Sequence, residues 1–206
     1  MQTNVSLKFT FIAVMYITLM IISNLMAVKI IDIGGLILTP GVFIFPFSFM
    51  FGDVLAEVYG FKNARKVIWI GLLVLLLMVV CMQVTLLLPY PDFWTHQEAV
   101  SYVFSTTPRI CLASATAYLF GSLTNAWTLE KIGRFTQGKH LWMRTIGSSV
   151  IGEVLDTGIF ITIAFFGTMP TTALLTMMLS QYLIKVGVEA LGGTPLAYQL
   201  VRWAKK

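Results

Sequence analysis

Six apolar stretches, separated by short connections, constrain the fold of this chain more than any other feature. A helix needs ~20 mostly apolar residues to cross a bilayer, and we expect such helices at about 8–28, 41–59, 67–88, 109–127, 141–166 and 172–201. Only 11% of the residues are charged, whereas soluble domains carry about 25%. The sequence therefore predicts an all-α, polytopic membrane protein with a single transmembrane domain over residues 1–206.

The connections show where irregular structure is expected. We predict a turn at 32–35, and the chain can re-enter the membrane near Pro40. Pro46 and Gly52 permit a kink or a break in the second helix, provided that the freed backbone groups are buried or hydrated. The longest connection, about 89–108, is rich in aromatic residues and suits an interfacial segment.

Basic residues fall almost entirely on one side of the predicted membrane. Six spans with the N-terminus inside place only Lys29 and Arg109 at the outer edge. This positive-inside bias predicts cytoplasmic N- and C-termini in a multi-pass membrane protein. The net charge of +5 lies in membrane-flanking loops and so does not indicate nucleic-acid binding. The inner-side residues are Lys8, Lys62, Arg65, Lys66, Lys131, Arg134, Lys139, Arg144, Arg202, Lys205 and Lys206.

Four carboxylates lie within the apolar stretches, at two similar places. Asp53 and Glu57 share one helix face in F-P-F-S-F-M-F-G-D-V-L-A-E-V-Y-G (45–60), and Glu153 and Asp156 follow in G-E-V-L-D (152–156). Each ionisable group at membrane depth costs at least ~2.5–3.5 kcal/mol on insertion scales, so such groups normally face a cavity, a partner or a substrate path. A structural hydrogen-bond network is the alternative, but we expect these two segments to form the centre of a transport site.

Three further residues are candidates for the site. Lys185, one turn from Glu189, is either a counter-charge to one of the acids or a substrate contact. Arg109 lies at the outer end of a predicted helix, which suits an interfacial anchor or a gate. Phe45 belongs to a Phe-rich run in which most rings are expected to face lipid or pack, while one or two can stack on a flat ligand.

The two halves of the sequence resemble each other. S-N-L-M-A-V-K-I at 23–30 aligns with T-N-A-W-T-L-E-K-I at 124–132, with one inserted residue. Asn24 precedes Asp53 by 29 residues, and Asn125 precedes Glu153 by 28. Each half holds three spans, so we predict two inverted three-helix repeats, at about 8–88 and 109–201. Such repeats place the substrate near the midplane, with Asp53 and Glu153 facing each other.

The sequence contains few of the motifs that mark enzymes, cofactor-binding proteins or metal-binding proteins. The sequence has no Gly-rich phosphate loop, paired-His metal motif or Gly-x-Ser-x-Gly elbow, so we expect neither an enzyme nor a cofactor nor a resident metal. An intramembrane aspartyl pair of Asp53 and Asp156 is the nearest catalytic idea. A cation channel, or a transporter for a divalent ion or another small solute, is the competing function, although Lys185 would oppose a cation.

Five motifs spread over nearly the whole chain are recognisable together. They are S-N at 23–24, F-P-F-S-F at 45–49, D-V-L-A-E-V-Y-G at 53–60 with Arg65 behind it, G-E-V-L-D-T at 152–157 and Y-x-x-K at 182–185. In this combination the chain resembles the queuosine-precursor transporter family, also called the VUT family. The resemblance implies a six-helix inner-membrane protein that imports 7-cyano- or 7-aminomethyl-7-deazaguanine, precursors of a modified tRNA nucleoside.

The implied substrate matches the polar residues already singled out. A guanine-like edge presents adjacent N–H donors, which one of the four carboxylates can accept in a charge-assisted pair. Asn24 and Asn125 can read the ring carbonyl or N3, an aromatic ring can stack on the base, and Lys185 can neutralise an unoccupied acid. The preferred precursor, the choice between facilitated and proton-coupled transport, a separate energising module and a homodimer in the lipid bilayer all stay open.

Overall fold

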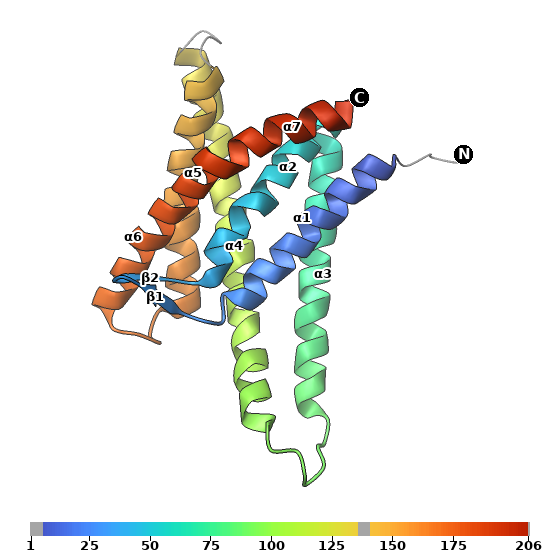
Figure 1. Cartoon of the computed structure of the whole chain (residues 1–206), viewed down its shortest axis with the longest axis vertical. Coiled ribbons are helices and arrows are strands. Elements are labelled where there is room, and N and C mark those ends of the chain that lie inside the picture. Colours follow the sequence, from blue (N-terminus) through green and yellow to red (C-terminus); the bar gives the residue numbers. More distant parts are fainter. Residues whose placement is uncertain (1–5, 136–140, 206) are drawn as a thin grey trace.

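The computed structural model describes residues 6–135 and 141–205 and is dominated by helices (Figure 1). The elements in chain order are α1 (Leu7–Met26), β1 (Ile31–Ile33), β2 (Leu36–Leu38), the 3-10 helix η1 (Pro40–Phe43), α2 (Phe45–Tyr59), α3 (Phe61–Leu87), α4 (Gln97–Phe135), α5 (Leu141–Phe165), α6 (Thr171–Val188), the π-helix η2 (Glu189–Gly193) and α7 (Thr194–Lys205). The predicted all-α membrane class is therefore confirmed, apart from one short hairpin.

Four helical segments of the described residues are long and apolar enough to cross a membrane. They are Leu7–Met26, Pro40–Tyr59, Lys62–Leu87 and Thr171–Gly193. The two termini, the α2–α3 junction and the α4–α5 end all lie toward the same end of the molecule (Figure 1). Six spans, cytoplasmic termini and the inverted repeat stay predictions.

A β-hairpin connects α1 to the second span at the predicted turn. Ile33 pairs with Leu36 across the two residues Gly34 and Gly35, which have φ values of 61° and 88°. Positive φ at both central positions is the geometry of a type I′ hairpin turn, which glycine adopts without steric cost. The Gly35 N–H donates to Asp32 Oδ1 at 2.7 Å. The hairpin returns the chain to η1, where Pro40 supplies the first residue.

The second span is divided, but its break precedes both residues that the sequence suggests. Ile44 separates η1 from α2, and Pro46 occupies the first turn of α2. A proline is tolerated there because its missing N–H would have no intrahelical partner. Gly52 lies inside the continuous helix. Consequently Phe45 begins α2 directly after the break.

Helix α4 begins earlier than the sequence predicts. The segment 89–108 was expected to be an interfacial connection, but its second half is helical from Gln97 onward, and Pro108 lies inside the helix. With 39 residues and a rise of 1.5 Å per residue, α4 is about 58 Å long and exceeds the ~30 Å hydrocarbon core. The prediction failed because the aromatic residues of this segment were interpreted as the sign of an interfacial connection. Membrane helices also tolerate a proline such as Pro108 where neighbouring groups satisfy the freed carbonyl.

The sixth predicted span combines three elements that continue one another (Figure 1). Its α-helical hydrogen bonding changes at the π-helix η2, which contains Glu189 and ends at Gly193. Beyond it, α7 is amphipathic and packs on α2. The apolar span predicted at 172–201 therefore changes character at 189–193, because the sequence pattern does not distinguish a π-segment from a regular helical turn.

Two larger clusters of buried side chains form most of the core. One joins α1, α2 and α3 around Ile12, Val54 and Leu55. The other joins α4, α5 and α6 around Ile110, Ile161 and Met177. A third, smaller cluster joins Met20, Leu75 and Cys111 of α1, α3 and α4. Each of the two larger clusters belongs mainly to one half of the chain, and the pocket described next is lined from both halves.

Candidate functional site

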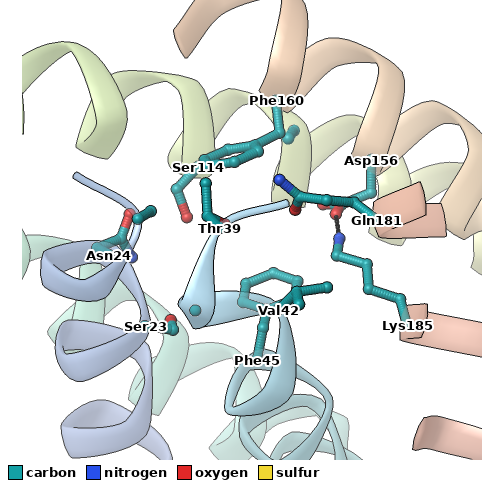
Figure 2. Close-up of a pocket in the computed structure, with 13 residues that line it drawn as sticks. Ser23, Asn24, Thr39, Val42, Phe45, Ser114, Asp156, Phe160, Gln181 and Lys185 are labelled. Carbon is teal, nitrogen blue, oxygen red and sulfur yellow. Dashed lines mark hydrogen bonds and ion pairs between the residues drawn. The ribbon is translucent and has the colours of Figure 1, made fainter. Parts of the chain in front are cut away.

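A pocket lies where α1, η1 and the start of α2 meet α4, α5 and α6. It has about 360 Å³ of empty space, counting the part open to the outside. Its wall combines small, aromatic and polar side chains (Figure 2). The lining residues are Ser23, Asn24, Ala27, Thr39, Gly41, Val42, Phe45, Ser114, Ala117, Asp156, Phe160, Gln181 and Lys185.

Close backbone packing allows η1 to form one wall of this pocket. A Cβ added to Gly41 would overlap the backbone oxygen of Ser23. Glycine at this position therefore lets η1 approach the end of α1. Ser23 and Asn24 are held there by hydrogen bonds from Ser23 Oγ and Asn24 Nδ2 to Met20 O, at 2.9 and 2.8 Å.

A buried ion-pair cluster forms the opposite wall. Asp156 Oδ2 accepts a hydrogen bond from Lys185 Nζ (Figure 2), and Glu153 Oε2 lies 3.1 Å from the same nitrogen. The exposed fractions are 4% for Lys185, 2% for Asp156 and 8% for Glu153. Glu153 and Asp156 share a face of α5 because they are three residues apart. Two carboxylates thus share one ammonium group, and this pairing offsets the cost of burying the charges.

Three polar atoms around the pocket have no hydrogen-bond partner in the described part of the chain. Asn24 Oδ1 and Asp156 Oδ1 are acceptors, and Gln181 Nε2 is a donor. Asn24 and Gln181 are 2% and 1% exposed. A buried polar atom without a partner costs roughly 1–3 kcal/mol. The pocket therefore offers two acceptors and one donor to a bound polar molecule.

Two aromatic rings accompany these atoms. Phe45 projects between Asn24 and the Gln181 side of the pocket, and Phe160 lies on the far wall (Figure 2). Lys185 Nζ is 4.4 Å from the centroid of the Phe45 ring, within the range of a cation–π contact. The pocket thus combines flat apolar surfaces with a few polar groups, the usual composition of a specific ligand site.

The structure brings some of the sequence-derived candidates together and separates others. Asn24, Phe45, Asp156 and Lys185 line the pocket, and Glu153 lies behind them on Lys185. The Asn125 side chain lies outside the described part of the structure. These placements leave the four pocket residues and Glu153 as the connected group.

Asp53 and Glu57 of α2 do not line this pocket. The Asp53 side chain is exposed on the surface of the chain, and Glu57 forms an exposed ion pair with Lys205 of α7 at 2.9 Å. Glu189 lies within electrostatic range of both Asp53 and Glu153.

Arg109 has a contact that the sequence did not indicate. Its Nε donates to Ile163 O at 2.7 Å, and its Nη2 donates to Phe166 O at 2.5 Å. These carbonyl groups belong to the C-terminal end of α5, where a cation is favoured by the helix dipole and by the free acceptors. Arg109 therefore caps α5 and joins it to α4.

Sequence reasoning overlooked Gln181, Thr39 and Phe160 as lining residues. Gln181 precedes Lys185 by four residues on α6, so the two side chains share a helix face, and this spacing was the available signal. Thr39 and Phe160 have no comparable signal, because their position depends on the hairpin and on packing between α4 and α5. Among the described residues, no group of three or more His, Cys, Asp or Glu side chains is arranged to hold a metal ion.

The sequence is similar to those of known membrane transporters. Residues 39–200 match the family described as "Putative vitamin uptake transporter". The chain is 34% identical over 177 residues to the "Probable queuosine precursor transporter" of Bacillus subtilis (strain 168), covering 85% of this chain and 77% of the relative. It is 29% identical over 144 residues to the "Queuosine precursor transporter" of Escherichia coli (strain K12), covering 70% and 62%.

No solved structure matches the chain significantly. The family match spans most of the sequence and includes every pocket element from η1 to α6. The chain therefore belongs to the vitamin uptake transporter family, whose members are transporters and not enzymes.

Proposed function

We propose that this protein imports 7-deazaguanine precursors of queuosine across the cytoplasmic membrane and binds the base in the pocket around Asp156. The names of its relatives support the substrate class. The observation that carries the proposal is the set of unpartnered atoms on Asn24, Asp156 and Gln181 beside the Phe45 ring. In this proposal the chain is a six-span inner-membrane protein with both termini in the cytoplasm.

The polar atoms complement the edge of a guanine-like base. The ring N–H and the exocyclic amino group are adjacent donors, which Asp156 Oδ1 accepts in a charge-assisted hydrogen bond. Gln181 Nε2 donates to the ring carbonyl oxygen, and Asn24 Oδ1 accepts a remaining donor. Each of these bonds replaces an unsatisfied atom of the empty pocket, so substrate binding does not have to break an existing protein contact at these atoms.

The other candidate residues take supporting roles in this proposal. Glu153 shares Lys185 with Asp156, so that the cluster keeps a negative charge near the pocket when Asp156 contacts the substrate. That charge also suits the cationic aminomethyl group of one precursor. Phe45 and Phe160 provide flat surfaces for stacking. Asn125 stays a proposed counterpart of Asn24, and Asp53 and Glu57 are assigned no contact with the base.

Binding measurements with matched variants test the proposal. We expect 7-cyano- or 7-aminomethyl-7-deazaguanine, but not adenine, to raise the melting temperature of the purified, detergent-solubilised protein. Asp156→Asn should weaken binding by about 10- to 150-fold, because a hydrogen bond to a charged group contributes ~1.5–3 kcal/mol. Asp53→Asn is the matched control and should bind normally. Equal weakening by both variants, or binding that survives Asp156→Asn, would contradict the assignment of the base to this pocket.

A further inference from the structure

A second cavity lies beside the candidate substrate pocket. It has about 280 Å³ of empty space, again counting the part open to the outside, and four helices contribute to its wall. From α1 and α2, three of the lining side chains carry an aromatic ring or a polar group: Tyr16, Phe45 and Ser48. The full lining is Tyr16, Met20, Phe45, Ser48, Leu72, Leu75, Ser114, Ala115 and Tyr118.

The second cavity is displaced toward the end of the molecule that holds both termini. On α1 it is lined by Tyr16 and Met20, whereas the first pocket is lined by 23–27, farther from the N-terminal end. On α2 it extends the lining from Phe45 to Ser48, and on α4 it extends it to Tyr118. On all three helices the lining moves toward the end of the molecule where the α2–α3 junction, the α4–α5 end and the termini lie (Figure 1). The positive-inside pattern makes this the cytoplasmic end.

Phe45 belongs to the wall of both cavities, as does Ser114. The ring is held from two sides: Lys185 Nζ lies 4.4 Å from its centroid, and the Phe49 ring packs edge-on at 4.8 Å. Phe49 in turn lies 5.4 Å from Tyr118, whose side chain is hydrogen-bonded to Tyr16. A connected row of aromatic side chains thus runs from Phe45 through Phe49 to Tyr118 and Tyr16, and the last two line the second cavity.

We propose that the second cavity is the next position of the substrate on its way to the cytoplasm, and that the Phe45 ring is the partition that must move to admit it. The inference rests on the proposed function for the identity of the substrate. Tyr16 and Tyr118 supply aromatic surfaces for a flat base at this second position, and Ser48 and Ser114 supply hydroxyl groups. The second cavity thus binds the same class of ligand as the first pocket, a flat heteroaromatic base.

The ion-pair cluster connects substrate binding to the partition. Lys185 contacts both Asp156 and the Phe45 ring. A base that donates a hydrogen bond to the unpartnered Asp156 Oδ1 shares this carboxylate with the ammonium group, which is bonded to Oδ2. The shared carboxylate attracts Lys185 less strongly, without losing the contact, and Lys185 is one of the two groups that hold Phe45. Phe45 also begins α2 immediately after the break at Ile44, so the ring lies at a helix end instead of in a continuous helix.

Filling the second cavity tests the path. We compare Leu72→Trp, which places an indole in the cavity wall, with Leu73→Trp, whose side chain points out of the bundle and is 64% exposed. Leu72→Trp should bind the deazaguanine within about twofold of the parent in detergent, yet its uptake into proteoliposomes should fall at least ~10-fold. Leu73→Trp should change neither. Parental uptake by a folded Leu72→Trp protein would overturn the path.

A second measurement needs no substrate and so separates this inference from the proposed function. Ser48 is buried, and a cysteine placed there reports on access to the second cavity. We expect N-ethylmaleimide to label Ser48→Cys slowly, and several times faster when Phe45→Ala is added, because the two cavities then join. The unsubstituted chain gives the background from Cys81 and Cys111. Equal labelling rates with and without the Phe45 ring would show that it is no partition, whatever the chain transports.

Discussion

Replacing Lys185 by methionine tests the central electrostatic feature of the fold. The substitution keeps the length of the side chain but removes the only charge that the described structure places between Asp156 and Glu153. Both carboxylates are buried, and Glu189 adds a third negative group within electrostatic range of Glu153. In the variant, the buried carboxylates of Asp156 and Glu153 lie close together without the ammonium group that pairs with both.

The expected cost follows from the geometry. At an effective dielectric constant of about 20, opposite charges separated like Lys185 Nζ and Glu153 Oε2, 3.1 Å apart, attract by about 5 kcal/mol. Desolvation of the ions offsets part of this attraction, but deleting one partner leaves the other charges buried and unpaired. Such deletions cost about 3–5 kcal/mol. Lys185→Met should therefore lower the folding equilibrium constant by roughly two to three and a half orders of magnitude.

Unfolding in detergent, followed by tryptophan fluorescence, measures this loss. Lys62→Met is the control because it removes an exposed lysine from the start of α3, and it should change stability little. The triple variant Lys185→Met, Asp156→Asn, Glu153→Gln should recover much of the loss, since the unpaired charges are gone. A cost below about 1 kcal/mol for Lys185→Met, or no recovery in the triple variant, would refute the account of the cluster.

Substitutions at four further positions test the packing of α4 and α5 and one exposed ion pair. Arg109→Leu should destabilise the protein by about 1.5–3 kcal/mol because it uncaps α5, whereas Arg109→Lys should recover part of the loss in the same unfolding assay. Gly121→Ala should destabilise by about 1–3 kcal/mol and weaken deazaguanine binding, because the new Cβ would lie 2.9 Å from Asp156 Cβ. Its control, Gly158→Ala, meets no atom within 4 Å and should behave like the parent. Lys205→Ala breaks only an exposed ion pair and should cost less than about 1 kcal/mol.

Much of the helical framework follows from the sequence because a bilayer demands long apolar segments. The first three spans and the β-turn were predicted close to their observed places, since their boundaries carry local signals such as the Gly34–Gly35 pair. The extent of α4 was not predictable in this way. Its first turns pack beside α3, where Gln83 Nε2 donates to Phe104 O at 2.8 Å, and such long-range contacts leave no local pattern.

The composition of the site was predictable only in part. Buried charge is costly in a membrane, so Asp156, Glu153 and Lys185 could be selected as a group from their positions in apolar stretches. The same argument selected Asp53 and Glu57, which lie outside the pocket, because an apolar neighbourhood in sequence does not reveal which helix face is covered. The pairing of Lys185 with both α5 acids depends on how α5 packs against α6, and this arrangement is a tertiary property.

Uptake by the reconstituted protein tests the central claim most directly. Radiolabelled 7-cyano-7-deazaguanine would be offered to proteoliposomes that contain the full chain, with protein-free liposomes as the background. The account predicts saturable uptake that unlabelled 7-aminomethyl-7-deazaguanine inhibits and adenine does not, and that Asp156→Asn reduces. Uptake at the liposome background, together with protein-dependent uptake of a divalent cation, would contradict it.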